Sequence, residues 1–453
     1  MGMRRALIDL APLRSSPRFR RLWIGRACSG FGSQMTLVAV MFQVWHMTGS
    51  TVWTGAVGLA QAVPLIAFGL AAGSLTDRSD RRRLYLAATT GQAACSGLLA
   101  VQGFSGRLPV AGVLLLVAAQ ACFVAGAGPA SRTFIPRLLP RDQVAAGLAL
   151  NRIGFQAAAL AGPALAGLLL GWLGVGGCYL ADTITFALAI YGAFGLPPMR
   201  PEGEPSRPGL SGVLDGLGFL ARNAAVRGAL LTDLAATVLS MPISLFPLIN
   251  AERFGGDPRT LGLLLTAIAV GGVIASVFSG TFTRLPRPGL VMLGGSAAWG
   301  AALALFGAVP DPWLGLALLV VAGAADTVAV VSRSTIVQLH TPDALLGRVL
   351  AAEQIVGQAG PDVGNMRAGL VAGAASGAAA LVSGGVLCLT AVAVVGAATP
   401  ELRRSSTARS GTDSAAAGQP AAARRRLRSG SPGAGMVGAS GSREGGLISA
   451  SRR

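Results

Sequence analysis

Lysine is absent from this 453-residue chain, because all 37 of its basic residues are arginine. A phosphate-binding P-loop requires a lysine after its glycines, and Schiff-base chemistry requires a lysine amine. The absence therefore excludes ATP hydrolysis of the P-loop type and cofactors of the pyridoxal or retinal kind. We expect no ATP and no bound cofactor.

Charged residues are also scarce, at 12% of the chain against 52% hydrophobic residues. Soluble domains carry about a quarter charged residues, so this composition favours a membrane protein. The formal charge of +18 invites a nucleic-acid interpretation. That interpretation requires basic residues clustered on a polar face with aromatic residues among them, whereas the chain has only three tyrosines and its arginines lie mainly in the short connections between apolar stretches and in the terminal segments. We expect no nucleic-acid partner.

Cysteine occurs five times, always in apolar segments and at irregular spacing. No CxxC pair and no nearby histidine accompanies these residues, so they indicate neither a disulfide framework nor a metal site. The cysteines are interpreted as small packing residues in helices.

Long apolar stretches fill most of the chain, and a membrane helix needs about 20 such residues to cross the hydrocarbon layer. The first stretch is too long and too polar for a cleavable signal peptide. Twelve stretches qualify as spans: 22–46, 53–75, 84–104, 109–130, 144–173, 176–196, 228–250, 260–283, 289–309, 313–332, 349–372 and 377–398.

The arginines predict how these spans are oriented. Connections on one side carry 31 of them, those on the other side carry three, and three lie within spans. Positive charge accumulates on the cytoplasmic side of membrane proteins, so both termini are predicted to be cytoplasmic. The chain is expected to be a multi-pass protein of the plasma (inner) membrane, with the lipid bilayer as a partner.

An internal repeat predicts a duplicated architecture. The segment that begins with Ser131-Arg132 recurs 201 positions later at Ser332-Arg333, in the connection after the fourth span of each half. The predicted fold is all-α, with twelve transmembrane helices in two pseudo-symmetric six-helix bundles. The predicted parts are a cytoplasmic N-terminus (1–21), a first bundle (22–196), a cytoplasmic connection with an amphipathic helix (197–227), a second bundle (228–398) and a disordered arginine-rich tail (399–453).

The connection after the second span carries a recognisable motif. Residues 73–82 read GSLTDRSDRR, which resembles the GxLaDRxGRR signature of the major facilitator superfamily at the same loop. The sequence departs from that signature at Asp80, where the family often has glycine for a tight turn. In the second half of the chain, Asp326 lies about two turns inside the tenth span. It is predicted to pair with Arg284, Arg287 or Arg333 in a cytoplasmic gate, and the alternative is that it carries a proton. The resemblance implies a cytoplasmic gate formed by Gly73, Asp77, Arg78, Arg81, Arg82, Asp326 and Arg333.

The fifth span contains Gly162, Pro163 and Gly167, in a segment that resembles the GxxxGPxxGG motif of proton-coupled exporters in that superfamily. The alternative is generic packing of small residues, which this chain has throughout. Over residues 16–400 the chain resembles the branch that contains the enterobactin exporter. That resemblance implies export of siderophores or amphipathic drugs.

Charged residues inside spans are costly and are candidates for function. Arg152 lies near the predicted midplane, where it would receive an anionic substrate group or form a fixed pair with Asp182. Asp182 and Asp362 are the candidates for carrying a proton, and Asp362 is also a candidate partner of Arg367. Gln34, Gln156 and Gln358 are among the candidates for lining an amphipathic pocket.

These patterns predict a secondary active transporter and not an enzyme. We expect a monomer that works by alternating access and exports an amphipathic small molecule, a siderophore or drug-like compound, driven by a proton gradient. One alternative is an uptake transporter of the same fold. An alternative from another class is a membrane receptor or scaffold that transports nothing.

Overall fold

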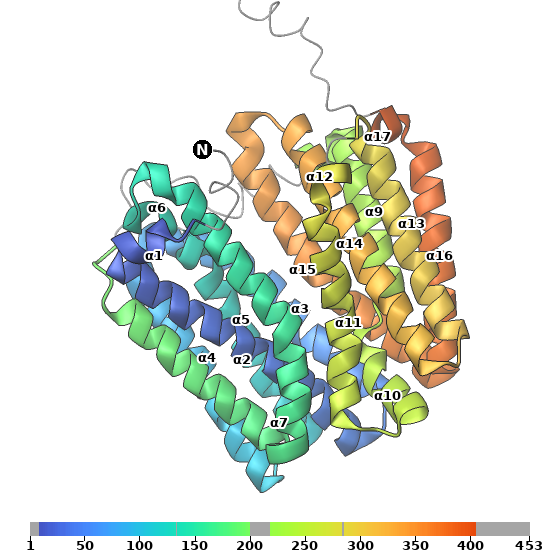
Figure 1. The fold of residues 1–453 in the computed structure, drawn as a ribbon, viewed down its shortest axis with the longest axis horizontal. Coiled ribbons are helices and arrows are strands. Elements are labelled where there is room, and N and C mark those ends of the chain that lie inside the picture. The colour runs from blue at the N-terminus through green and yellow to red at the C-terminus, as the bar shows by residue number, and fades with distance from the viewer. Residues whose placement is uncertain (1–8, 133, 200–217, 283–284, 405–453) are drawn as a thin grey trace, which may run out of the picture. The chain divides into compact units, whose positions relative to one another are not determined.

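The computed structural model describes residues 9–132, 134–199, 218–282 and 285–404. Within these ranges the side chains of residues 69–78, 129, 132, 141, 280, 343–348, 350–352 and 354–356 are not described. All the regular elements in the described residues are helices (Figure 1). The all-α prediction is confirmed.

The first bundle begins with a short surface helix and ends with a very long helix. Its elements are α1 (Ala11–Ser15), α2 (Pro17–Thr48), α3 (Thr51–Arg78), α4 (Arg81–Ser105), α5 (Val110–Arg132), α6 (Phe134–Leu138) and α7 (Val144–Phe194). The 51 residues of α7 are about twice what one crossing needs. The helix is broken at Gly174, whose φ of 66° and ψ of −168° suit glycine, so α7 contains two crossings joined by a sharp turn.

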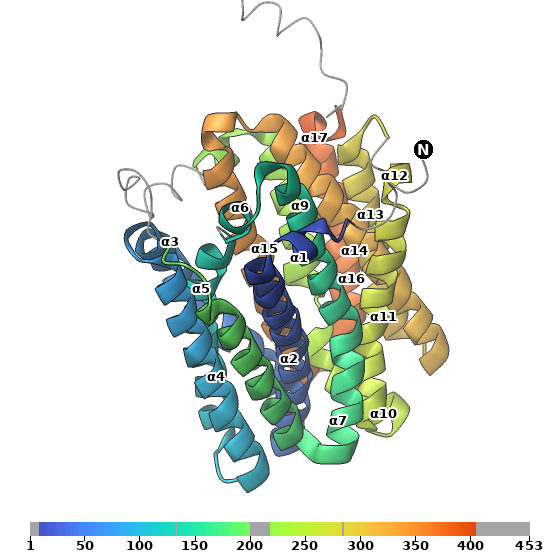
Figure 2. The same cartoon turned by 60° about the vertical axis from the view of Figure 1, so that its left-hand side comes forward.

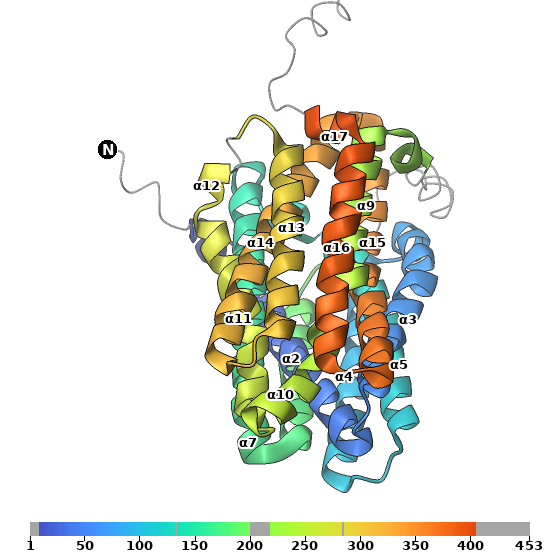
Figure 3. The ribbon, with the colours of Figure 1, turned by 90° about the vertical axis from the view of Figure 1, so that its right-hand side faces the viewer.

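The second bundle follows after residue 217. Its elements are α9 (Ala224–Ser240), α10 (Phe246–Phe254), α11 (Pro258–Val277), α12 (Ser279–Phe282), α13 (Pro288–Ala308), α14 (Pro312–His340), α15 (Asp343–Ala374), α16 (Gly377–Ala398) and α17 (Pro400–Arg404). Figure 3 shows α13, α14 and α16 along one side of this bundle. A 3-10 turn, Ile243–Leu245, joins α9 to α10 after Pro242 interrupts the helix.

The long helices are consistent with the twelve predicted spans. In the described residues, ten helices are long and apolar enough to cross a membrane, and α7 is one of these ten. Charged residues interrupt α15, but its 32 residues exceed the length of one crossing. Counting α7 twice and adding α15 is consistent with twelve crossings.

Several helices begin at a residue whose side chain caps the N-terminus of the helix. Ser16, Asp80, Asn223, Asp311 and Ser376 each accept a hydrogen bond from a backbone N–H in the first turn of the following helix. Such caps satisfy amide groups that have no partner within the helix. The sharp ends of the spans therefore follow from local sequence.

The two bundles meet at the end of the molecule opposite α1 and α17. There α3 packs against α15, and α7 packs against α11, as Figure 2 shows for the second pair. Two hydrogen bonds cross between the bundles, from the Thr51 hydroxyl to the Gly369 carbonyl and from the Thr54 hydroxyl to the Ser244 carbonyl, each 2.9 Å long. Glycine makes this approach possible, because a Cβ added at Gly55 would lie 2.9 Å from the Asn365 carbonyl oxygen.

The predicted start of the tail at residue 399 is too early. Residues Pro400–Arg404 form α17, and Leu402 is fully buried against Ala225, Ala229 and Met292. One apolar side chain thus extends the packed chain to residue 404, and residues 405–453 lie outside the described part. The predicted amphipathic helix in 197–227 also falls mostly outside it, although its Leu220 is buried against the second bundle.

Candidate functional site

A cavity of about 360 Å³ lies where α2, α3, α4 and α5 face α15. Aliphatic side chains supply much of its wall, among them Leu37, Val40 and Val117. Its polar lining consists of Ser33, Thr36, Gln61, Gln92, Gln120, Gln358 and Asp362. Among the described lining residues, Asp362 is the one that carries a charge, so the cavity is amphipathic and acidic.

Asp362 lies on α15 at the point where this helix touches α3. Its backbone carbonyl packs directly against Gly58, so the carboxylate stands beside the contact between the bundles. Within the described part of the chain the carboxylate makes no hydrogen bond and no ion pair. It is therefore available to a molecule in the cavity.

The predicted pairing of Asp362 with Arg367 is wrong. The guanidinium of Arg367 donates to the carbonyl oxygens of Leu239 and Ala380 and to the Ser383 hydroxyl. The helix α9 ends at Ser240, just before Pro242, and this interruption leaves the Leu239 carbonyl in need of a donor. Arg367 caps the interrupted helix.

Asp182 is fully buried in the first bundle. Its Oδ2 accepts hydrogen bonds of 2.7 Å from the hydroxyls of Thr36 on α2 and Ser96 on α4. The Gln120 amide donates to Ser96 at 2.9 Å, while Oδ1 of Asp182 has no partner within the described residues and lies against Gly32. Thr36 and Gln120 also line the cavity, so they connect it to the buried carboxylate.

Arg152 does not pair with Asp182, contrary to one of the two sequence interpretations. The two residues lie on opposite sides of the break at Gly174, and Arg152 is 22 residues before it while Asp182 is 8 after it. At 1.5 Å per residue these separations correspond to about 33 Å and about 12 Å from the turn, too different for contact. The Arg152 side chain is exposed and is not among the described residues of the cavity wall.

Two of the predicted pocket glutamines, Gln34 and Gln156, lie outside the described cavity wall as well. Gln34 packs against Gly162 at the contact of α2 with α7, where a Cβ would collide with the glutamine side chain. Gln156 is half-buried on α7. Gln358, a third predicted pocket glutamine, does line the cavity, together with Gln61, Gln92 and Gln120, which the sequence interpretation did not single out.

The segment that resembles the exporter motif lies at the contact of α7 with α11. The Pro163 carbonyl oxygen would lie 2.5 Å from a Cβ at Gly262, and the Pro258 carbonyl oxygen would lie 2.9 Å from a Cβ at Gly167. Backbone therefore touches backbone between the two bundles. Gly162, the remaining residue of the motif, serves packing within the first bundle.

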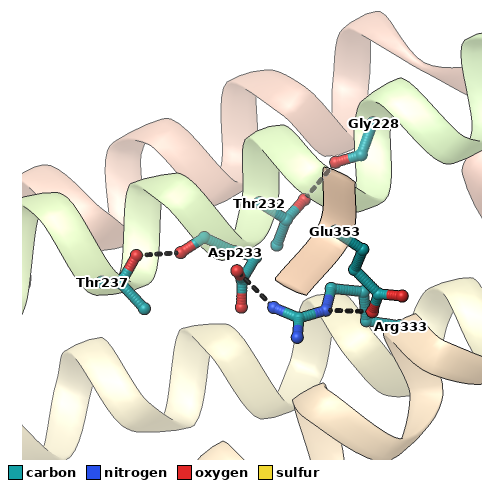
Figure 4. A network of polar contacts seen from close by, with 6 residues as sticks. All are labelled: Gly228, Thr232, Asp233, Thr237, Arg333 and Glu353. Atoms are coloured by element: carbon teal, nitrogen blue, oxygen red, sulfur yellow. Dashed lines mark hydrogen bonds and ion pairs between the residues drawn. The ribbon is translucent and has the colours of Figure 1, made fainter. Parts of the chain in front are cut away.

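An ion-pair network ties three helices of the second bundle together (Figure 4). Arg333 of α14 contacts Asp233 of α9 and donates from Nε to Glu353 of α15 at 3.0 Å. The predicted pairing of Asp326 with Arg333 is therefore wrong, because two other carboxylates already occupy the guanidinium. Asp326 lies within electrostatic range of Asp233 and Arg333 but makes no ion pair among the described residues. Arg287 is exposed and Arg284 lies outside the described residues.

The loop motif is described in its second part, while the side chains of Gly73, Asp77 and Arg78 lie outside the described residues. Asp80 caps α4 by accepting from the N–H groups of Arg82 at 2.9 Å and Arg83 at 3.4 Å. It also accepts from Met199 N–H at 3.2 Å. Its φ of −62° and ψ of 112° are open to any residue, so the departure from glycine costs nothing here.

The arginines after Asp80 fasten α4 to the end of α7. The Arg82 guanidinium donates to the Phe194 carbonyl and lies 5.7 Å from the centre of the Phe194 ring. The Arg81 N–H donates to the Met199 carbonyl at 3.1 Å. Partial burial raises the pKa of the Asp80 carboxyl, but hydrogen bonds from Met199, Arg83 and Arg82 outweigh it and hold that pKa below its usual value.

Comparison with known proteins agrees with this architecture. The family model described as transmembrane secretion effector matches residues 8–423. The enterobactin exporters EntS of Shigella boydii serotype 18 and of Escherichia coli O1:K1 are each 29% identical over 399 residues, covering 85% of this chain and 94% of the relative.

Solved structures share the fold at low identity. A POT family transporter in complex with 5-aminolevulinic acid has a TM-score of 0.70 and 12% identity, over 86% of this chain and 97% of that one. A bacterial homologue of the human lysosomal transporter Spinster, inward-facing and unoccupied, has a TM-score of 0.66 and 16% identity, over 87% and 99%. The chain therefore belongs to the transmembrane secretion effector family, and it is a multi-pass membrane transporter of the major facilitator type rather than an enzyme.

Proposed function

We propose that this protein exports an amphipathic small molecule, a siderophore or a drug-like compound, in exchange for protons. The observation that carries the proposal is the amphipathic cavity between α2–α5 and α15, beside contacts that close one end of the bundle interface. A transporter that works by alternating access needs such a site, reachable from one side at a time. The enterobactin exporters to which the chain is similar support siderophore export.

The charge distribution supports the orientation that export requires. With 31 arginines on one side, the termini are cytoplasmic, and the contacts of α3 with α15 and α7 with α11 lie at the outer end. A cavity closed toward the outside is ready to receive a molecule from the cytoplasm. One chain provides all the described walls of the cavity, so a monomer suffices.

The proton gradient supplies the energy in this proposal, and no cofactor takes part. Asp182 and Asp362 are the residues proposed to take up and release the proton. Asp362 faces the cavity directly, and Asp182 reaches it through Thr36 and Gln120. A site that takes up a proton when the substrate leaves couples the two movements.

Proteoliposomes with an imposed proton gradient test the proposal. We expect a catechol siderophore or a lipophilic drug to be moved against its gradient while protons move the opposite way, as reported by a pH-sensitive dye on the vesicle interior. Vesicles that hold the same amount of folded Asp182→Asn/Asp362→Asn protein are the control. Substrate and protons moving in the same direction would support uptake instead, and no movement of any compound would overturn transport of this class.

A further inference from the structure

Among the described residues of its wall, the cavity contains one unpaired charge, and that charge is negative. From this we infer that the transporter selects its substrates by charge, accepting uncharged or singly positive molecules that carry hydrogen-bond donors and rejecting anions. The inference rests on the proposed function for the site itself and adds the chemical class of the substrate. It concerns binding in the cavity, whatever gradient drives transport.

No arginine lines the described part of the cavity, and the guanidinium groups of Arg367 and Arg333 are engaged elsewhere. Arg367 donates to two carbonyl groups and a hydroxyl, and Arg333 holds two carboxylates. Arg152 is exposed outside the described cavity wall. An anion that entered would meet the Asp362 carboxylate without any neutralising cation, in surroundings that screen charges poorly.

Two side-chain amide groups of the described wall are available to form hydrogen bonds with the substrate. Within the described residues the side-chain amides of Gln61 and Gln358 make no hydrogen bond, and both line the cavity with Asp362. An amide donates and accepts, whereas an ionised carboxylate only accepts. A ligand that donates to Asp362 through a hydroxyl, an amide or an ammonium group therefore finds matching partners.

The rest of the wall shows how a cation would be held. The described apolar lining is aliphatic, with Leu37, Val40, Val57 and Leu65 among its members, and it contains no aromatic ring. Attraction of a cation to ring faces is therefore absent from this wall, and the attraction depends on Asp362. Among siderophore chemistries, uncharged catechols and hydroxamates fit the cavity, and polycarboxylates do not.

Equilibrium binding to the purified full-length protein in detergent tests the inference. The probes are the cationic dye rhodamine 6G, its carboxylate-bearing counterpart rhodamine 19 and the anion carboxyfluorescein, each followed by fluorescence anisotropy. We expect rhodamine 6G to bind at least about tenfold more tightly than the other two. Equal affinities for the cation and the anion would overturn the inference.

Variants of Asp362 connect the selectivity to this carboxylate. In Asp362→Asn we expect the affinity for rhodamine 6G to fall about tenfold and the preference over rhodamine 19 to disappear. Asp362→Glu keeps the charge and should keep the preference, while Asp311→Asn changes an exposed helix cap and should alter nothing. An unchanged preference in folded Asp362→Asn, verified by thermal unfolding, would overturn the assignment to Asp362.

The binding experiment separates this inference from the proposed function. Charge selectivity in detergent together with no transport in proteoliposomes would refute export and leave the selectivity standing. Transport of cations and anions alike would refute the selectivity and leave export standing.

Discussion

The hydroxyl of Thr36 lines the cavity and donates a 2.7 Å hydrogen bond to Oδ2 of Asp182, which is itself fully buried. The groups that face this carboxylate are the hydroxyls of Thr36, Ser96 and Thr185 and the amide of Gln120. No cation pairs with it among the described residues. A buried carboxylate without a cationic partner is costly to keep ionised. Through the Thr36 hydroxyl, a single hydrogen bond separates this carboxylate from the cavity.

Replacing Asp182 by asparagine should uncouple the transporter. The amide keeps the size and the acceptor oxygen of the carboxyl but cannot exchange a proton. We expect proton-driven transport in proteoliposomes to fall at least about tenfold, while the binding of rhodamine 6G changes little because Asp182 is not in the cavity wall. Transport driven by a substrate gradient alone should persist.

Thr36→Val tests the same proton coupling without changing Asp182 itself. The replacement keeps the branched shape and removes the hydroxyl that joins the cavity to Asp182, at a cost of about 1.5–3 kcal/mol for a hydrogen bond to a charged group. We expect slower proton-coupled transport with retained folding. Full coupling in both folded variants would contradict a role for Asp182 in carrying the proton.

Arg333→Ala should destabilise the second bundle more than most single substitutions. Asp233 and Glu353 would remain buried without their shared cation, and removing one partner of a buried ion pair costs about 3–5 kcal/mol. Thermal unfolding in detergent should show the loss. The double variant Asp233→Asn/Glu353→Gln provides a second test. In that background Arg333→Ala should lower the thermal stability clearly less, because no buried carboxylate loses its partner. Equal costs in the two backgrounds would contradict the network.

Periodicity and hydropathy predicted most of the fold, because each span must be apolar along its own length. The same criterion located the break near Gly174, since a 51-residue apolar helix cannot cross a membrane once. It failed at Leu402, where a single apolar residue in a polar tail packs against Ala225 and Ala229. One residue gives no periodic signal, and its burial depends on the neighbours that the fold provides.

The partners of charged residues were less predictable than the helices. Sequence places Asp182, Asp362 and Arg367 inside spans and Arg333 at the end of one, but their partners come from other helices. Arg367 illustrates the difficulty, because its partner is the Leu239 carbonyl, a backbone group that becomes an acceptor only where Pro242 interrupts α9. Proximity in sequence favoured Asp362 instead, which has no ion-pair partner among the described residues.

Gly58→Ala should disturb the contact of α3 with α15, at the end of the molecule that we propose faces outward. A methyl group at Gly58 would collide with the Asp362 carbonyl, so α3 and α15 must separate, and overpacking of this kind costs about 1–3 kcal/mol. We expect lower thermal stability and transport reduced severalfold. Gly294→Ala adds the same methyl group to α13, where no atom lies within 4 Å, and should have no effect. Identical behaviour of the two variants would show that the α3–α15 contact does not matter for transport.

Arg152→Ala should leave the cavity unchanged. The side chain is exposed on α7 and contacts neither Asp182 nor the described cavity wall, so the affinity for rhodamine 6G and its preference over carboxyfluorescein should equal those of the wild type. Asp362→Asn, measured in parallel, should lose that preference. A loss of binding in folded Arg152→Ala would restore the arginine to the substrate site, as the sequence alone suggested.

Asp80 should make stability depend on pH in the acid range. Its folded-state pKa is lowered below 3.8, because the hydrogen bonds from Met199, Arg83 and Arg82 outweigh the effect of burial. The unfolded chain therefore binds the proton more readily, so this carboxylate stabilises the fold above about pH 4 and the contribution disappears as the pH falls through the lowered value.

Asp80→Asn keeps an acceptor at the helix cap and removes the charge, whereas Asp80→Ala removes the cap as well, at a cost of about 0.5–2 kcal/mol. Thermal unfolding between pH 7 and pH 3 should show a constant difference between wild type and Asp80→Asn down to about pH 4 and a shrinking one below it. A difference that grows on acidification would mean that the charge at residue 80 opposes folding.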